Sequence, residues 1–122
     1  MINPVTWFEI PVNDMQRAKK FYEKSFDIKM ELTDFDKLQM AWFPFDKNGT
    51  GSTGTLIKGE SYIPSYEGTM VYISVRDIES ALKAIENAGG KILNPKTSIG
   101  EYGFVAHFED SEGNRVALHS DQ

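Results

Sequence analysis

The sequence contains one pattern twice, 63 residues apart. The segment 10–23, Ile-Pro-Val-Asn-Asp-Met-Gln-Arg-Ala-Lys-Lys-Phe-Tyr-Glu, aligns with the segment 73–86, Ile-Ser-Val-Arg-Asp-Ile-Glu-Ser-Ala-Leu-Lys-Ala-Ile-Glu, and six positions are identical. Each copy alternates apolar residues as a strand does, and then has an Asp followed by apolar residues at helical spacing. A period this long predicts two copies of one supersecondary unit, because solenoid repeats are shorter and more numerous. Pairing the two units is expected to create a cleft with near two-fold symmetry.

Length and composition indicate one globular domain over residues 1–122, with 40% hydrophobic and 25% charged residues. No run approaches the roughly 20 apolar residues of a membrane span. The first residues lack the basic and apolar regions of a signal peptide, so we expect a cytoplasmic protein. A net charge of −5 argues against binding nucleic acid or an anionic membrane. The absence of cysteine excludes disulfides and thiolate metal sites.

Each unit is predicted to be a strand, a helix and then three strands. Asp14 and Asp77 are suited to cap the helices, because an Asp carboxylate accepts hydrogen bonds from the free amides at a helix start. The pair Gly89-Gly90 is typical of a helix end. The expected ranges are about 1–58 for module 1 with its helix at 14–26, 59–68 for the linker, and about 69–122 for module 2 with its helix at 77–88. The expected strands lie near 5–12, 28–33, 38–45, 54–58, 70–75, 91–94, 103–109 and 115–119, with a hairpin turn at 110–114.

These features resemble the vicinal oxygen chelate superfamily, the group of glyoxalase I, the bleomycin-resistance proteins and the extradiol dioxygenases. The resemblance is carried by the βαβββ repeat, Val-x-Asp-(x)3-Ala-(x)2-Phe-Tyr at 12–22, Gly89-Gly90, and Phe-Glu-Asp-Ser-Glu-Gly-Asn at 108–114. It covers essentially the whole chain and implies an α+β fold in which two βαβββ modules form a cup-shaped mixed sheet with the helices outside. It also implies a homodimer, the commonest closed assembly. It does not choose a function, because this fold hosts isomerases, dioxygenases, thiol transferases and binding proteins.

Enzymes of the family hold a divalent metal with up to four His or Glu ligands, one from the first and one from the last strand of each unit. The resemblance places these positions at Trp7, Met70, Ala117 and either Gly54 or Thr55. Such side chains cannot enclose a hard cation, which needs several oxygen or imidazole donors. We therefore expect no metal at the usual positions.

Strand parity predicts which side chains line the cup, because alternate residues of a strand point to opposite faces. The parity of the apolar core positions faces the helices, and the opposite parity faces the cup. A hairpin at 110–114 would set His107 across from Ala117 and diagonal to His119. The predicted cup residues are Trp7, Glu9, Met70, Tyr72, His107, Ala117 and His119.

Three hypotheses follow for the cup, each with a plainer alternative. Glu9, His107 and His119 could form a displaced two-His-one-carboxylate site for iron, zinc or nickel. Alternatively, His119 could be solvated near the C-terminus while His107 bonds across strands. Glu9 could act as a general base with a pKa raised by apolar neighbours such as Trp7, or it could pair with a cation. Trp7, Met70 and Tyr72 could form an apolar floor on which a planar ligand stacks, or they could simply fill the interface between the units.

Two classes of function are consistent with this pattern. The first is a glyoxalase-related enzyme, either a lactoylglutathione lyase-like lyase or isomerase or a dioxygenase-like protein, acting on a carbonyl compound with Glu9 as its acid-base group. The second is a non-catalytic protein that binds or sequesters a small molecule, as the bleomycin-resistance branch does without a metal. In either class we expect the ligand to contact Trp7, Met70, Tyr72 and His107, with His119 bonding to a ligand oxygen.

Overall fold

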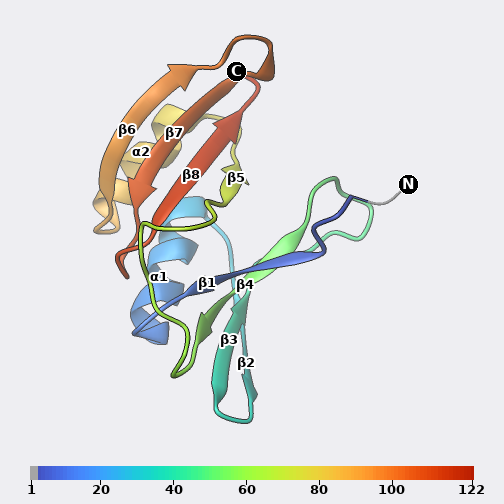
Figure 1. Ribbon diagram of the computed structural model, residues 1–122. Coiled ribbons are helices and arrows are strands. Elements are labelled where there is room, and N and C mark those ends of the chain that lie inside the picture. Colours follow the sequence, from blue (N-terminus) through green and yellow to red (C-terminus); the bar gives the residue numbers. More distant parts are fainter. Residues whose placement is uncertain (1–2) are drawn as a thin grey trace.

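The computed structural model describes residues 3–122, which fold as strand, helix and three strands, twice over (Figure 1). The elements are β1 (Trp7–Pro11), α1 (Met15–Phe26), β2 (Glu31–Phe35), β3 (Leu38–Trp42), β4 (Thr53–Lys58), β5 (Tyr72–Ser74), α2 (Ile78–Asn87), β6 (Lys91–Ser98), the short 3-10 helix η1 (Gly100–Tyr102), β7 (Phe104–Glu109) and β8 (Arg115–Ser120). The strands form two four-stranded sheets, in the orders β1–β4–β3–β2 and β5–β8–β7–β6. Each module's first strand pairs in parallel with its last, and the other neighbours are antiparallel. The predicted α+β fold of two βαβββ modules is confirmed.

The largest difference from the expected bounds is in β6, which continues to Ser98 although Pro95 interrupts its pattern. Proline has no amide hydrogen, so it is tolerated on an edge strand or at a bulge. β6 is an edge strand, and its pairing with β7 shifts register between Ile92 and Asn94 and again between Asn94 and Thr97. The bulged edge therefore accommodates the proline that made a shorter strand the natural prediction.

Both helices begin at the predicted Asp and bury one side. Asp14 accepts a hydrogen bond from the Arg17 amide at 3.0 Å, and Asp77 accepts one from the Ser80 amide at 3.3 Å. Neither helix in residues 3–122 is long and apolar enough to cross a bilayer. The buried residues are Met15, Ala18, Phe21, Tyr22 and Ser25 in α1, and Ile78, Leu82 and Ile85 in α2.

The two glycines after α2 are needed for different reasons. Gly89 has a φ of 102°, in the left-handed region that favours glycine. Gly90 packs so closely that a Cβ atom there would lie 2.6 Å from Cγ2 of Ile85 and 2.9 Å from the carbonyl oxygen of Glu109. The first glycine therefore turns the chain, and the second lets the start of β6 lie close to the helix.

Aromatic side chains of α1 join the two modules. The Tyr22 ring packs edge-on against Phe43, which follows β3, with 5.5 Å between ring centroids. On the other side, Phe21 and Phe26 each lie 6.3 Å from the ring of Phe108 in β7. α1 and α2 also contact each other, so one core cluster includes residues of both sheets and both helices. Each sheet therefore keeps one face without a helix, which we call its open face (Figure 1).

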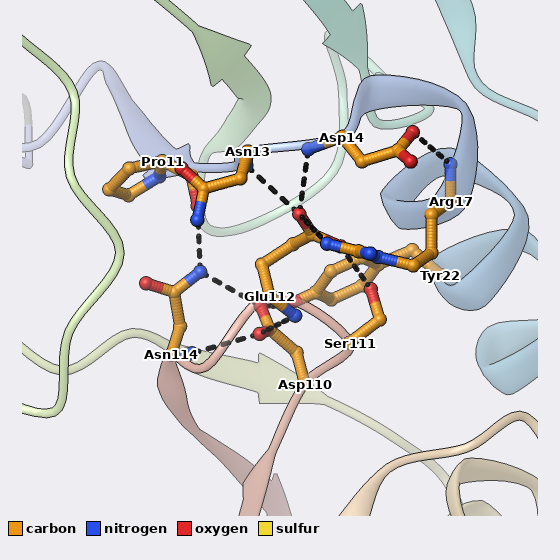
Figure 2. A network of polar contacts seen from close by, with 9 residues as sticks. All are labelled: Pro11, Asn13, Asp14, Arg17, Tyr22, Asp110, Ser111, Glu112 and Asn114. Carbon is orange, nitrogen blue, oxygen red and sulfur yellow. Dashed lines mark hydrogen bonds and ion pairs between the residues drawn. The ribbon is translucent and has the colours of Figure 1, made fainter.

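The turn between β7 and β8 carries a buried carboxylate that organises it. Asp110 is 3% exposed, and its two oxygens accept hydrogen bonds from the amides of Glu112 (2.8 Å) and Asn114 (2.9 Å). They also accept from the Tyr22 hydroxyl (2.7 Å) and from Nδ2 of Asn114 (3.0 Å), as Figure 2 shows. Burial raises the pKa of Asp110 above its ordinary 3.8, although these hydrogen bonds act against the rise. The bond from Tyr22 thus connects the turn of module 2 to α1 of module 1.

Asn114 extends this connection to β1 and to the linker. Its Nδ2 donates to the carbonyl oxygen of Pro11 at 2.7 Å, and its Oδ1 accepts from the Ser65 amide at 3.1 Å. The residue is 4% exposed, so these bonds are sheltered from water. One side chain therefore holds three segments that are far apart in the sequence.

Glu112 makes a second connection, to the start of α1. Its side chain is fully buried and accepts hydrogen bonds from the amides of Asn13 (2.9 Å) and Asp14 (2.8 Å) and from Nε (2.8 Å) and Nη2 (3.0 Å) of Arg17. Burial by itself would raise the pKa of Glu112, but the bonds from Arg17, Asp14, Ser111 and Asn13 together hold it below its ordinary 4.5. The carboxylate therefore satisfies amides that the beginning of α1 would otherwise leave free.

Substituting Asn114 by Ala should destabilise the protein strongly. The change leaves the Pro11 carbonyl and the Ser65 amide without their partner and removes a donor from Asp110, so we expect a loss of about 2–4 kcal/mol in the free energy of unfolding. Urea unfolding monitored by circular dichroism measures it. The control Asn48→Ala, in an exposed loop, should change stability by less than about 0.5 kcal/mol. Equal stability of the two variants would contradict the role assigned to Asn114.

Glu112 should also shape the stability in acid. Its folded-state pKa lies below the ordinary 4.5, so its ionised form stabilises the fold above that pH, and this contribution is lost as the pH falls through the folded pKa. Glu112→Gln should lower the free energy of unfolding at pH 7 by about 1–3 kcal/mol. It should also make the further decrease of that free energy between pH 7 and acidic pH smaller. The raised pKa of Asp110 has the opposite effect, because protonation of Asp110 stabilises the folded state as the pH falls. Asp110→Asn removes this gain, so the stability should fall more steeply in acid. Urea unfolding between pH 7 and about pH 2 tests both, and parallel profiles for Glu112→Gln and the parent would refute the assignment.

Candidate functional site

The open face of module 1 carries aromatic and polar residues side by side. The strand register places Trp7 beside Thr53 and Glu9 beside Thr55, and it places Trp42 beside Thr55 from the other neighbouring strand. Residues that are level in register, or two apart on one strand, share a face. Trp7 is 56% exposed and Glu9 is exposed as well, so this face is accessible in one chain.

The register also decides between Gly54 and Thr55 as the fourth of the family's metal-ligand positions. Glu9 pairs with Thr55 as its repeat mate Tyr72 pairs with Ala117, so Thr55 is the counterpart of Ala117. Thr55 is fully buried, and its hydroxyl has no hydrogen-bond partner within residues 3–122. The set offers one hydroxyl and neither imidazole nor carboxylate, so it does not fit a hard divalent cation. The four positions are Trp7, Thr55, Met70 and Ala117.

The open face of module 2 holds both histidines. His107 lies across from Ala117, as predicted, and His119 is two residues further along β8, so the histidines are diagonal neighbours. The Tyr72 ring stands edge-on to the His107 ring, with 6.2 Å between centroids. Burial first, and then the nearby charge of Arg115, lower the pKa of His107 below its ordinary 6.5. His107 is therefore a neutral imidazole at pH 7, able to donate one hydrogen bond and accept one.

His119 is engaged by the backbone. Its Nε2 lies 2.6 Å from the carbonyl oxygen of Tyr102. A carbonyl oxygen can only accept, so Nε2 carries the hydrogen and donates it. This bond connects β8 to η1, a role that the sequence analysis did not predict for this histidine.

Cavities lie between the modules, and two of them are large. One of about 620 Å³ lies between the end of α1 and the start of α2, with Phe26, Phe43 and Ile73 in its wall. Another of about 520 Å³ lies between β1 and β5 and is lined by Phe8, by the loop residues 50–52 with Thr53 of β4, and by residues 69–74. The predicted site residues Met70 and Tyr72 thus share a cavity with a segment of module 1.

A smaller cavity of about 210 Å³ lies beside the linker. Glu9 lines it from β1 and Arg115 from the start of β8, and linker residues close its side. These linker residues are Ile63, Ser65, Glu67 and Thr69. The cavity is therefore built from both modules, at the junction that Asn114 holds together.

In one chain the predicted cup residues do not line a single cavity. Trp7 lies exposed on the open face of module 1, while Met70 and Tyr72 line one cavity and Glu9 lines another. Within residues 3–122 no group of three or more His, Asp or Glu side chains is close enough to hold a metal ion. A single chain therefore does not assemble the displaced metal site hypothesised for Glu9, His107 and His119.

The sequence analysis missed two residues that share these faces, Trp42 and Arg115. Trp42 alternates with the buried Ala41 and the half-buried Phe43, so the parity of its strand already indicated an outward indole. Arg115 has the parity of Ala117 and His119, which also indicated the open face.

Comparisons with known proteins agree with this architecture. Residues 3–118 match the model of the Glyoxalase/Bleomycin resistance protein/Dioxygenase superfamily. A glyoxylase-like domain-containing protein of Didymella fabae is 30% identical over 121 residues, which cover 93% of this chain and 91% of that protein.

Solved structures show the same fold at lower identity. A glyoxylase/bleomycin resistance protein/dioxygenase domain from Frankia sp. EAN1pec has a TM-score of 0.76 at 14% identity and full coverage of both chains. TnmS3, an antibiotic binding protein from Streptomyces sp. CB03234, has a TM-score of 0.72 at 20% identity, covering 99% of this chain and 98% of that chain. Glyoxalase I from Zea mays has a TM-score of 0.72 at 24% identity over 97% of this chain, which spans only 46% of the maize chain.

Proposed function

Because this chain belongs to the glyoxalase/bleomycin resistance protein/dioxygenase superfamily, we propose that it binds a planar small molecule on its open faces without a metal ion. The observation that carries the proposal is the set of side chains at the four family metal positions, which offers only one hydroxyl. An indole stands at one of these positions, where a metal ligand would otherwise be. Binding must then rely on apolar contact and a few hydrogen bonds.

The side chains on the open faces suit such a ligand. Trp7 and Trp42 share the face of module 1, and Tyr72, 49% exposed, lies beside His107 on module 2. Exposed aromatic rings offer a large apolar area at a small cost in conformational entropy, and Trp and Tyr add a polar group at the edge. An antibiotic binding protein with the same fold supports the proposal.

The enzymatic alternative, a lyase or isomerase acting on a carbonyl compound with Glu9 as the base, has less support. A general base works best within an enclosed site close to the reacting proton. Glu9 is exposed in one chain, and Thr55 is its neighbour in register. Catalysis by Glu9 would need further side chains to cover it.

We also propose that two copies complete the site in a homodimer. β1 and β5 each form the edge of a sheet, and an edge strand with free amides and carbonyls is a natural place for pairing. The aromatic open faces lie next to these edges, and a monomer rarely leaves such a surface uncovered. A two-fold dimer would cover both edges at once and create two equivalent sites.

Ligand binding should be visible in the fluorescence of either indole. The chain has two tryptophans, so Trp42→Phe leaves Trp7 alone and Trp7→Phe leaves Trp42 alone. Both variants should respond to the same aromatic compound in a screen of planar aromatic and dicarbonyl molecules. The loss of one ring contact should weaken binding by about 0.5–1.5 kcal/mol, or about 2- to 12-fold. Protein treated with EDTA should bind equally well. A fluorescence response that appears only after Zn²⁺, Ni²⁺ or Fe²⁺ is added would refute metal-independent binding. If the fluorescence of neither variant changes with any compound, the aromatic site is refuted.

Light scattering should give twice the chain mass of 13.8 kDa at micromolar concentration. Tyr72→Asp should shift the protein towards monomer, because it places a carboxylate in the proposed interface. Leu32→Asp is the control, since Leu32 is 47% exposed in β2, at the opposite edge of the sheet from β1. A parent protein that stays monomeric at high micromolar concentration would refute the dimer.

A further inference from the structure

The cavity of about 210 Å³ beside the linker has the features of a small polar site. Drug-sized ligands occupy roughly 300–1,000 Å³, so this cavity is too small for one. At about 30 Å³ per water molecule, it has room for roughly seven non-hydrogen atoms. It therefore suits a very small molecule.

Arg115 supplies the positive charge of this cavity, whose wall also holds the carboxylates of Glu9 and Glu67. Its Nε is buried and has no hydrogen-bond partner within residues 3–122, and no carboxylate there forms an ion pair with the guanidinium. Its cross-strand neighbour Glu109 instead accepts a hydrogen bond from the Tyr66 hydroxyl. A buried donor without a partner is costly, and a guanidinium matches a carboxylate with two parallel bonds.

Hydrogen bonds hold the backbone around Arg115. The Arg115 amide donates to the carbonyl oxygen of Ser65 at 3.4 Å, and the preceding Asn114 is fixed to Ser65 and Pro11. The guanidinium is thus carried by a segment whose backbone is already ordered. A ligand that binds it avoids much of the entropy cost of ordering the site.

Glu9 lines the same cavity from β1. A carboxylate accepts hydrogen bonds only, so it needs a donor such as a hydroxyl or an ammonium group. We propose that this cavity binds a small hydroxy- or amino-carboxylic acid, with the acid group on Arg115 and the hydroxyl or amino group facing Glu9. Because Glu9 also belongs to the open face of module 1, the inference rests on the proposed function and names the polar chemistry of its ligands.

NMR titration of the unmodified protein tests the proposal without any substitution. Glycolate and alanine should shift the Arg115 Nε–H resonance and saturate at roughly millimolar concentration, which is usual for such small ligands. Glycolamide has the size of glycolate without its charge and should bind at least tenfold more weakly. Equal binding of glycolate and glycolamide, or no shift at Arg115 with either acid, would overturn the proposal.

Variants then assign the roles of the two charged groups. Arg115→Gln should weaken glycolate binding by about tenfold or more, and Arg115→Lys should restore part of it, since Lys keeps the charge without the two-pronged geometry. Arg76→Gln, which alters the wall of a different cavity, should have no effect. Glu9→Gln should weaken binding of alanine more than that of glycolate, because only the ammonium group gains from the negative charge. Unchanged glycolate affinity in Arg115→Gln would overturn the proposal.

The outcomes separate this inference from the proposed function. If aromatic compounds change the tryptophan fluorescence but no small acid binds, the proposed function stands and the acid site is wrong. If acids bind through Arg115 and neither indole responds to any compound, the acid site stands and the aromatic site is wrong.

Discussion

The buried polar turn between β7 and β8 fixes how the two modules sit together, and the other features of the molecule follow from it. Its side chains contact β1, the start of α1 and the linker, and the bond from Asn13 to Glu112 spans 99 positions of sequence. Apolar packing such as that of Phe21 on Phe108 tolerates sliding, because dispersion has no direction. Buried hydrogen bonds do not, because each broken one leaves a buried group unsatisfied. The turn thus selects one docking geometry among those that the aromatic core would permit.

That geometry joins the modules through their helices. Because α1 and α2 contact each other, the aromatic core lies between the sheets, and the open faces carry the side chains available to ligands. The free edges β1 and β5 border these faces. A site that uses both faces therefore needs either a ligand that bridges the modules of one chain or a second chain. This requirement links the proposed aromatic site to the proposed dimer, although each is tested by its own experiment.

The fold could be predicted from the sequence because its signals are local. Asp14 and Asp77 cap the helices, Gly89 and Gly90 end one of them, and strand alternation separates the core from the open faces. The turn at 110–114 was also predictable as a hairpin, and with it the pairing of His107 with Ala117. The surroundings of the site residues were not predictable, because parity gives the face of a side chain but not what stands opposite that face. Whether Glu9 shares a cavity with Arg115 depends on how the modules dock, and the docking rests on hydrogen bonds between distant residues.

The two junctions between the modules differ because the two modules close their last hairpin differently. In module 2 the five-residue turn 110–114 docks on the start of α1, beside the small cavity lined by Glu9 and Arg115. In module 1 the segment between β3 and β4 is longer, spanning 43–52, and most of it is exposed. This segment makes no comparable connection to α2 within the described residues, and the Asp77 carboxylate accepts from the amide and hydroxyl of Ser80 on its own helix. The large apolar cavities lie on this side, with Phe43, Pro44 and Thr50 in their walls. The same repeated unit thus produces one junction held by buried hydrogen bonds and another lined by apolar cavities.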